Sequence, residues 1–471
     1  MRDAVVVGAG MGGLTAAHAL AAAGLRPLVL EAGDRVGGLV QHARVGGIDV
    51  DAGAESFALR RPEVADLVAR LGLADATPAT ASTIWTGDRA LTTPARSLLG
   101  IPADPLADDV VAVVGPEAAT RAAADLSLDP AAGGDATTLA ELVTVRMGAG
   151  LLERLVRPVA RGIHGADPEN LAVDAVAPGL RAALVTHGSL AAAVAATVPD
   201  GPAVGCVVGG MWRLPEALAA SAEVRTGTRV TAVTREADGT WLVHADDGAP
   251  PVRTRRLVLA VPGPGPETVE LLSGVVPGEL PELRPGHPIV QVTLVLDASE
   301  LDAAPLGSGV LVGPDAGVRT KALTHATAKW GWLRSTVPQG VHVLRLSYGR
   351  AGDDPAAIDA VDAEVALADA QALLGVPLDR AQVLDSLRVR RPLGLPPSAA
   401  ADPALRPLLE RVHATSGLGV CGAWVAGTGV AAVVAQAEQE ARRLLEGPAA
   451  GDGSLLGDTS PLSAVHPPIL D

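Results

Sequence analysis

The sequence predicts an α/β protein that contains a doubly wound parallel sheet. Residues 4–7 form a short, uninterrupted apolar run, which is typical of a parallel strand buried on both faces. A glycine-rich loop follows at residues 8–13, and residues 14–23 are rich in strong helix formers. Gly24 closes that helix before a second apolar strand at residues 27–30. This strand–helix–strand unit predicts a Rossmann-like domain.

Length and composition exclude several classes of protein. With 471 residues, 48% of them hydrophobic, the chain can bury more than one core, so several domains are expected. A formal net charge of −16 argues against binding to nucleic acid, whose phosphates repel an acidic surface. Cys206 and Cys421 are the only cysteines, and no spacing of ligating residues predicts a metal site.

The sequence also predicts where in the cell the protein is located. No apolar run reaches the roughly 20 residues that a membrane-spanning helix needs. The first residues, Met1, Arg2 and Asp3, lead directly into the first strand and leave no room for a signal peptide. We therefore expect a cytoplasmic protein with no transmembrane segment.

The loop at residues 8–13 has the glycine spacing of a dinucleotide-binding motif, G-x-G-x-x-G. In this motif Gly8 makes the turn, Gly10 lets a pyrophosphate approach, and Gly13 lets helix and strand pack closely. The helix N-terminus then faces the phosphates. Glu31 follows near the offset of about 20 residues at which an acidic side chain binds a ribose hydroxyl. An adenosine with a free 2′-hydroxyl is expected, and both NAD and FAD provide one.

Two further glycine-containing runs favour FAD over NAD. Residues 35–38, Arg-Val-Gly-Gly, allow backbone amides to face more of the pyrophosphate or the flavin. Residues 422–430 form another run before the helix-forming stretch 436–445, whose N-terminus would face a polar edge of the ligand. Taken alone, this run is equally typical of an ordinary loop before a helix. Because no motif places a Cys or His for covalent attachment, we expect FAD to be bound non-covalently.

At this point the sequence resembles the flavin-containing amine oxidase superfamily, and within it the oxygen-dependent protoporphyrinogen/coproporphyrinogen III oxidases of actinobacterial type. The resemblance runs nearly from end to end. Each matching segment is weak evidence alone, but the whole set, which occurs in the same order along the chain, is more specific to these enzymes. The segments are residues 46–57, 99–102, 161–168, 187–190, 209–211, 321–330 and 422–429.

The glycine motifs and the resemblance together name the residues expected to contact FAD. Val230 is placed beside the adenine by the resemblance alone. The full expected set is Gly8, Ala9, Gly10, Met11, Gly12, Gly13, Glu31, Ala32, Arg35, Gly37, Gly38, Leu39, Gly53, Ala54, Glu55, Ser56, Val230, Ala423, Thr428, Gly429 and Val430.

The resemblance also implies a reaction. The flavin takes hydride from the methylene bridges of a porphyrinogen, a tetrapyrrole, and O2 then reoxidises the flavin with release of hydrogen peroxide. Since the cofactor supplies this step, we predict no catalytic side chain. Coproporphyrinogen III is preferred over protoporphyrinogen IX, and a haem-pathway enzyme is the partner that the resemblance suggests.

The substrate's propionates call for arginine, whose planar fork binds a carboxylate through two hydrogen bonds. Arg60 and Arg61 follow the segment expected to contact the flavin and are the candidates for this role. The more common alternative is that each is a solvated arginine before a helix that starts at Pro62.

Three other functions stay open. An amine oxidase would surround the substrate amine with aromatic rings, which a chain with one Tyr and one Phe can hardly supply. A carotenoid-type desaturase would need an apolar face that docks on a membrane. A catalytically silent flavoprotein would bind FAD or porphyrin as a carrier.

One segment departs from the resemblance. Where such enzymes usually carry an Arg-Trp pair and a Pro-Gln-Tyr run, residues 390–397 read Arg-Arg-Pro-Leu-Gly-Leu-Pro-Pro. The aromatic groups of that pattern are missing from this segment. The sequence therefore does not determine how this wall of the substrate domain is built, and the possibility of a different substrate or an altered activity stays open.

Pattern and resemblance divide the chain into discontinuous domains. Residues 139–163 are mostly helix-forming with Pro158 as the one breaker, and they predict a helical subdomain. Apolar strands at residues 288–296 and 341–348 predict a second sheet, and residues 228–233 and 241–244 predict a hairpin. The expected parts are a FAD-binding domain (1–60, 206–265 and 415–446), an α+β substrate domain (61–99 and 266–414), a helical subdomain (100–205) and a flexible tail (447–471).

Overall fold

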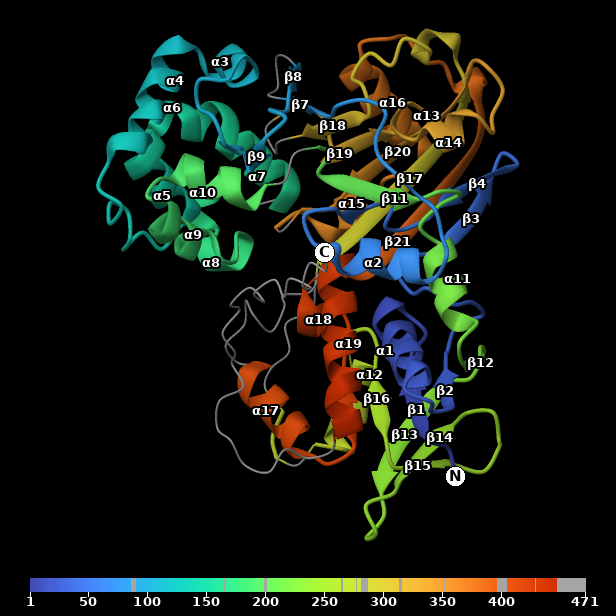
Figure 1. The fold of residues 1–471 in the computed structure, drawn as a ribbon. Helices are drawn as coiled ribbons and strands as arrows, with labels where there is room; N and C mark the ends of the chain where they lie inside the picture. Colours follow the sequence, from blue (N-terminus) through green and yellow to red (C-terminus); the bar gives the residue numbers. More distant parts are fainter. Residues whose placement is uncertain are drawn as a thin grey trace, which may run out of the picture.

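The computed structural model shows two sheets, one above the other, and a lobe of helices beside the upper sheet (Figure 1). It describes residues 1–85, 90–164, 167–198, 201–263, 266–276, 278–280, 287–312, 316–350, 352–395, 405–427 and 429–446. The tail predicted to be flexible, residues 447–471, lies outside the described residues.

A five-stranded parallel sheet forms the lower part of the molecule in Figure 1. All four residues of its central strand, β1, are buried, as the uninterrupted apolar run predicts. Helix α1 (Met11–Ala22) joins β1 to β2, and the predicted strand–helix–strand unit is thereby confirmed. The strands in spatial order are β12 (Glu223–Arg225), β2 (Pro27–Leu30), β1 (Ala4–Val7), β16 (Leu257–Leu259) and β22 (Leu418–Val420).

Helices cover one face of this sheet, and a small antiparallel sheet with two helices covers the other. The first layer consists of α1, α11 (Arg213–Ala219) and α19 (Val430–Glu446), and the short α18 (Ala423–Ala426) contacts both layers. The second layer consists of β13 (Val230–Arg235), β14 (Trp241–Ala245), β15 (Val252–Thr254), α12 (Pro266–Ser273) and α17 (Arg406–Ala414). The predicted hairpin is confirmed as β13 and β14.

The packing of α12 and α17 differs from that of the other elements in the expected substrate domain. Both helices fall in the range 266–414 that was assigned to the substrate domain. Leu272 of α12 and Leu408 of α17 instead belong to the same buried cluster as Val5 and Leu28 of the parallel sheet. Their apolar faces predict burial but carry no information about which sheet they bury against, and the domain boundaries stay a prediction.

A seven-stranded sheet forms the upper part of the molecule, and the two strands predicted for a second sheet are confirmed as β17 and β20. On one face it packs against α15 (Pro355–Asp359) and α16 (Ala363–Leu374). The strands in spatial order are β21 (Val383–Leu395), β17 (His287–Asp297), β20 (Val341–Tyr348), β19 (Ala322–His325), β18 (Gly309–Val312), β7 (Thr83–Trp85) and β8 (Ala90–Thr92).

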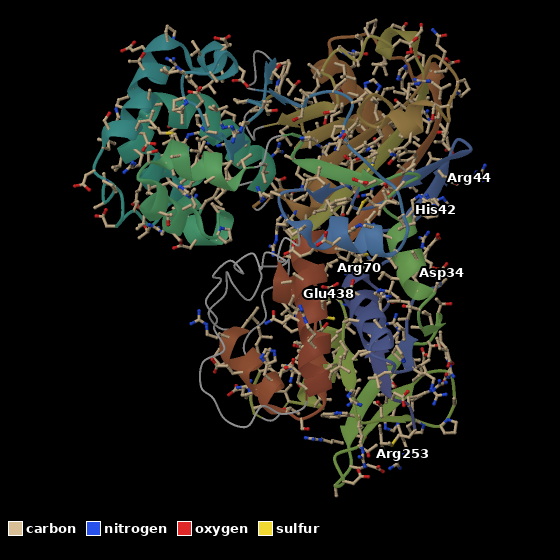
Figure 2. The ribbon with its side chains drawn as sticks, viewed as in Figure 1. Asp34, His42, Arg44, Arg70, Arg253 and Glu438 are labelled. Carbon is tan, nitrogen blue, oxygen red and sulfur yellow. The ribbon has the colours of Figure 1, made fainter. Side chains whose placement is uncertain are left out.

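Short elements fill the junction between the two sheets. The apolar core is continuous there, since Leu14 of α1 and Val343 of β20 belong to one buried cluster. Figure 2 labels Arg70 and Glu438, whose side chains form an ion pair of 2.5 Å. The junction elements are β3 (His42–Val45), β4 (Ile48–Asp51), β5 (Phe57–Ala58), α2 (Pro62–Arg70), β6 (Asp75–Ala76), β11 (Val204–Val207), α13 (Ala326–Lys329) and α14 (Gly331–Arg334).

The lobe of helices lies beside the seven-stranded sheet and has its own apolar core. The chain breaks at Gly148, which has a φ of +88°, and not at Pro158, so that prediction was wrong. A π-helical turn (Leu152–Val156) precedes α7 (Arg157–His164), so Pro158 lies in the first turn of α7. A proline is tolerated in the first turn of a helix, where its missing N–H group is not needed for a hydrogen bond. The helices are α3 (Asp108–Val114), α4 (Pro116–Ala123), α5 (Leu139–Met147), α6 (Ala149–Leu151), α7 (Arg157–His164), α8 (Val173–Val176), α9 (Leu180–His187) and α10 (Leu190–Thr197).

Within the described part of the chain, no single helix is both long and apolar enough to cross a membrane. The pair α9 and α10 meets that test only when the two are taken together, and they are bent by 115°.

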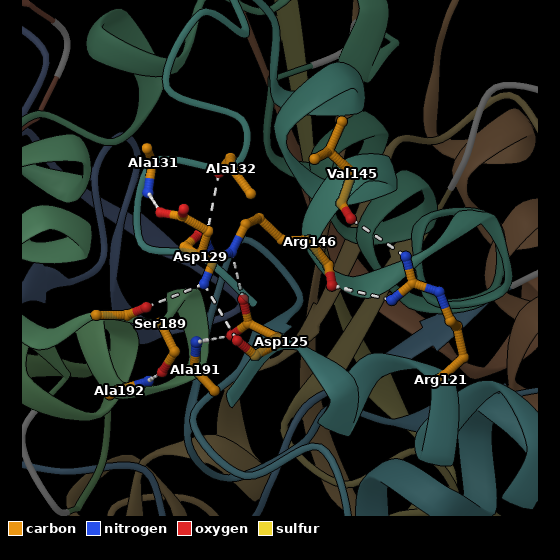
Figure 3. A network of polar contacts seen from close by, with 11 residues as sticks. Arg121, Asp125, Asp129, Ala131, Ala132, Val145, Arg146, Ser189, Ala191 and Ala192 are labelled. Carbon is orange, nitrogen blue, oxygen red and sulfur yellow. Dashed lines mark hydrogen bonds and ion pairs between the residues drawn. The ribbon is translucent and has the colours of Figure 1, made fainter. Parts of the chain in front are cut away.

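A buried ion pair ties the lobe together (Figure 3). Arg146 and Asp125 have fully buried side chains, and Arg146 Nε donates to Asp125 Oδ1 at 2.5 Å. The other guanidinium donors reach the carbonyl of Asp129 at 2.8 Å and that of Gly188 at 3.1 Å. The second carboxylate oxygen of Asp125 accepts from the amide of Ala191 at 2.8 Å. This network connects α5 with the loop before it and with α10.

We predict that Arg146→Met destabilises the lobe by about 3–5 kcal/mol, because it leaves the Asp125 carboxylate buried without its counter-ion. The exposed Arg121, which donates to two carbonyls at the end of α5, is a matched control. Arg121→Ala should cost about 1 kcal/mol. Denaturant unfolding with hydrogen exchange of α5 measures both, and equal effects of the two changes would contradict the prediction.

Candidate cofactor site

Two glycines of the loop at residues 8–13 are required by the protein's own packing. Gly8 has a φ of +101°, and a Cβ atom there would lie 2.5 Å from the carbonyl oxygen of Ala260. A Cβ atom on Gly13 would lie 2.0 Å from the carbonyl oxygen of Gly8. These contacts bring α1 close to β1 and β16, as the motif predicts.

Gly10 is different, because the space beside it is open. The nearest protein atom to a Cβ at this position would be Gly38 Cα, 4.0 Å away. Gly10 is also the N-cap residue of α1, and no side chain caps that helix. The amides of the first turn are therefore available to an anion, and the missing side chain leaves room for it.

Glu31 lies directly beside this loop. Its carboxylate accepts hydrogen bonds from the amide of Ala9 at 2.6 Å and from the amide of Gly33 at 2.7 Å. The segment before β13 lies alongside, since the amide of Thr228 donates to the Glu31 carbonyl at 2.8 Å. Val230 begins β13, so the residues expected around the adenosine meet at one edge of the parallel sheet. Ala32, which follows Glu31 in the sequence, is exposed.

The paired glycines extend the site toward the seven-stranded sheet. The amide of Gly37 donates to the Ala9 carbonyl at 2.8 Å, and a Cβ on Gly38 would lie 3.0 Å from Gly10 Cα. Leu39 then contacts the next expected segment, because its carbonyl accepts from the amide of Ala54 at 3.1 Å. Although it is apolar, the Leu39 side chain is 43% exposed, so a flat ligand could cover it.

The structure brings only some of the other residues expected to contact FAD close to the first glycine loop. Arg35 lies at the surface, where it donates to the His42 carbonyl at 3.3 Å and faces Asp34. At the C-terminal run, a Cβ on Gly12 would lie 3.2 Å from the amide nitrogen of Gly422, so this run contacts the first loop. Ala423 begins α18 and Val430 begins α19, with Gly429 between them. Thr428 lies outside the described residues.

The structure adds a cluster of charges around Glu55 that sequence reasoning missed. Lys329 Nζ lies 2.7 Å from Glu55 Oε1, and Arg345 forms an ion pair with the other carboxylate oxygen. Thr324 also donates to Glu55, at 3.2 Å. Burial alone would raise the pKa of Glu55, but Lys329 and Arg345 outweigh it and lower the pKa to about 2.

Cations of the seven-stranded sheet also hold the backbone of this loop. Arg345 Nη2 donates to the carbonyl of Gly53 at 2.5 Å, and Arg391 Nη2 donates to that of Ala52 at 2.7 Å. Next to them, Asp51 accepts from the amides of Met211 and Trp212 at 3.1 and 3.0 Å. Burial raises the pKa of Asp51 to about 6, although Arg345 and these two amides act against it.

The candidate substrate arginines lie on the surface at the start of α2. Both Arg60 and Arg61 are exposed, and Arg61 Nη2 contacts Glu63 Oε1 at 3.1 Å. Ser56, the last residue of the expected flavin segment, is half-buried just before β5. No contact in the structure assigns Arg60 or Arg61 to a cavity, so their role stays a prediction.

The described residues fit FAD better than a metal. The open space at Gly10, the uncapped helix α1 and the exposed Leu39 form one continuous surface for an extended dinucleotide. Among the residues that the structure describes, no group of three or more His, Cys, Asp or Glu side chains could hold a metal ion.

Comparison with known proteins agrees with this assignment. A family model described as flavin-containing amine oxidoreductase matches residues 11–445. The coproporphyrinogen III oxidase of Mycobacterium tuberculosis H37Rv is 31% identical over 464 residues, which cover 94% of this chain and 98% of the relative. That of Bacillus subtilis is 24% identical over 380 residues, covering 75% and 78%.

Solved structures show the same fold. A provisionally named protoporphyrinogen oxidase from Exiguobacterium superposes with a TM-score of 0.77 at 26% identity, covering 94% of this chain and 99% of the other. Putrescine oxidase with bound putrescine superposes with a TM-score of 0.59 at 18% identity, covering 94% and 99%. Since the family model spans most of the sequence and its cofactor fits the observed site, this chain belongs to the flavin-containing amine oxidoreductases and is an FAD-dependent oxidase.

Proposed function

We propose that this enzyme oxidises a porphyrinogen to the porphyrin with O2, and that coproporphyrinogen III is the preferred substrate. The observation that carries the proposal is the similarity to coproporphyrinogen III oxidases over 94% of the chain. The proposed setting is haem synthesis in the cytoplasm, with a haem-pathway enzyme as partner. Each catalytic round removes two hydrogen atoms from the substrate and reduces one O2 to hydrogen peroxide.

The bound FAD accepts the electrons, and the chain's own residues orient the reactants and exclude water. The first glycine loop and Glu31 would hold the pyrophosphate and the ribose. The segment from Gly53 to Glu55 is fixed to the seven-stranded sheet by hydrogen bonds and ion pairs, which supports its proposed place beside the flavin. A rigid segment there would keep the distance between cofactor and substrate constant.

The composition of the site argues against amine oxidation. The chain has one Tyr and one Phe, and both are buried: Phe57 in the core at the junction and Tyr348 against the helices behind the seven-stranded sheet. Neither can form an aromatic cage around a substrate amine.

The segment that departs from the family's pattern begins in β21, at one end of the seven-stranded sheet. Arg390 and Arg391 lie on β21, and Arg391 pairs with Ile289 of β17. Side chains beyond Pro392 in this segment lie outside the described residues. We propose that a strand replaces the aromatic wall here, and a desaturase or a silent flavoprotein is the function to consider if no porphyrinogen is oxidised.

We predict that the purified protein is yellow and releases its FAD on acid precipitation. The reason is that the described site supplies backbone amides and small residues, with both cysteines buried away from solvent. The flavin absorbance of the supernatant measures the release. Flavin that stays in the protein pellet, or a colourless protein that binds NAD, would contradict the prediction.

We predict that Gly10→Val abolishes FAD binding while the fold is retained. A valine side chain would meet the pyrophosphate, whereas no protein atom lies closer than 4.0 Å to the new Cβ. Gly13→Val is the matched control, since its Cβ would clash with the Gly8 carbonyl and should unfold the domain. Circular dichroism and flavin stoichiometry separate the outcomes, and wild-type flavin content in Gly10→Val would contradict the prediction.

We predict a higher specificity constant for coproporphyrinogen III than for protoporphyrinogen IX. Each extra propionate that meets an arginine gains a charge-assisted hydrogen bond of about 1.5–3 kcal/mol. Arg61→Ala should then raise the KM for coproporphyrinogen without changing the flavin spectrum, and Arg44→Ala, on the exposed strand β3, is a control. Turnover of both substrates under air with peroxide detection is the measurement. A preference for protoporphyrinogen would overturn the substrate, and no oxidation of either would overturn the proposed function.

A further inference from the structure

The charge cluster around Glu55 is not electrically balanced. Lys329, Arg345 and Arg391 supply three cations around the segment Ala52–Glu55, and Glu55 and Asp51 supply two carboxylates. Arg345 is 7% exposed and Glu55 and Lys329 are each 14% exposed at their side chains, so water screens these charges weakly. One positive charge is left in excess when both carboxylates are ionised.

The cluster begins where the dinucleotide surface ends. Gly10 contacts Gly38, the neighbouring Leu39 contacts Ala54, and the next residue, Glu55, carries the ion pairs. The adenosine end of this surface is at Glu31, whose carboxylate accepts a hydrogen bond from the amide of Ala9. An extended FAD whose adenosine lies at Glu31 would therefore direct its flavin toward the cluster.

Glu55 does more in this cluster than cancel charge. Its two carboxylate oxygens are divided between Lys329 at the end of the junction helix α13 and Arg345 in strand β20. Lys329 also lies 4.9 Å from the ring centre of Trp330, so its ammonium is held on two sides. The positions of both cations thus depend on one carboxylate.

We propose that Glu55 is a positioning residue that holds Lys329 and Arg345 beside the flavin, and that the net positive charge of this cluster raises the reduction potential of FAD. The inference rests on the proposed place of the cofactor. Its physical basis is that a flavin gains negative charge on reduction, and a nearby positive charge in a poorly screened environment stabilises that charge. A higher potential makes the removal of hydride from a substrate more favourable.

The test is the reduction potential of bound FAD in three variants of the full-length holoprotein. Lys329→Met removes a positive charge and should lower the potential. Glu55→Gln removes a negative charge at similar shape and should raise it. The double variant should return toward the wild-type value, because the two charges cancel. Each single change should alter the equilibrium of flavin reduction about tenfold or more, which is about 30 mV for a two-electron couple.

Matched controls come from an exposed ion pair between β21 and α15. Arg390 Nε lies 2.5 Å from Asp359 Oδ1, with side chains 39% and 44% exposed. Arg390→Met and Asp359→Asn remove the same charges where solvent screens them, and they should leave the potential unchanged. Lys329→Arg keeps the positive charge that Lys329→Met removes, so its potential should equal that of the wild-type protein.

A purely structural role would give a different pattern. Shifts of the same sign in Lys329→Met and Glu55→Gln, or wild-type potentials in both, would overturn the proposal. If Lys329→Met does not retain FAD, a rise in Glu55→Gln with a wild-type value in Lys329→Arg still supports it, and any other result there overturns it. The measurement needs no porphyrinogen, so it gives an answer even if the proposed substrate is wrong.

Discussion

The ion pairs of Glu55 with Lys329 and Arg345 are the constraint on which the relation of the two sheets depends. Glu55 belongs to the segment that continues the dinucleotide surface, whereas Arg345 belongs to β20 of the seven-stranded sheet and Lys329 to the junction helix α13. A buried ion pair adds little net stability, but loss of one partner is costly because the other charge is left without compensation. Such a contact therefore selects one arrangement of the two parts. The apolar core that continues through the junction supplies the stability.

The first glycine loop could be predicted from the sequence because its constraints are local. Gly8, Gly10 and Gly13 lie within one turn, and the roles of the first and last are visible as close approaches to protein atoms. Strands β1, β2, β17 and β20 were also predictable, since continuous or alternating apolar residues determine them. The positions that make the surface for a ligand follow from these local patterns.

The charge cluster could not be predicted in the same way. Lys329 lies 274 residues from Glu55 and Arg345 lies 290 residues away, and no local pattern encodes such a pairing. Two signals were nevertheless present. Arg345 stands between Leu344 and Leu346 in a mostly buried strand, and Lys329 is one of only two lysines in the chain. The packing partners of α12 and α17 were unpredictable for the same reason, because an amphipathic pattern predicts that a helix is buried but not which sheet it packs against.

The order of the strands in the parallel sheet has a consequence for synthesis of the protein on the ribosome. β1 and β2 are made first, β12 and β16 follow after the helical lobe, and β22 with α19 comes last. The lobe packs mainly through neighbouring segments and can fold as soon as it emerges. The sheet has to wait for nearly the whole chain, with α1 and β1 lacking the helix that covers them. During translation this protein must keep an apolar N-terminal segment from aggregating until its C-terminal partner arrives.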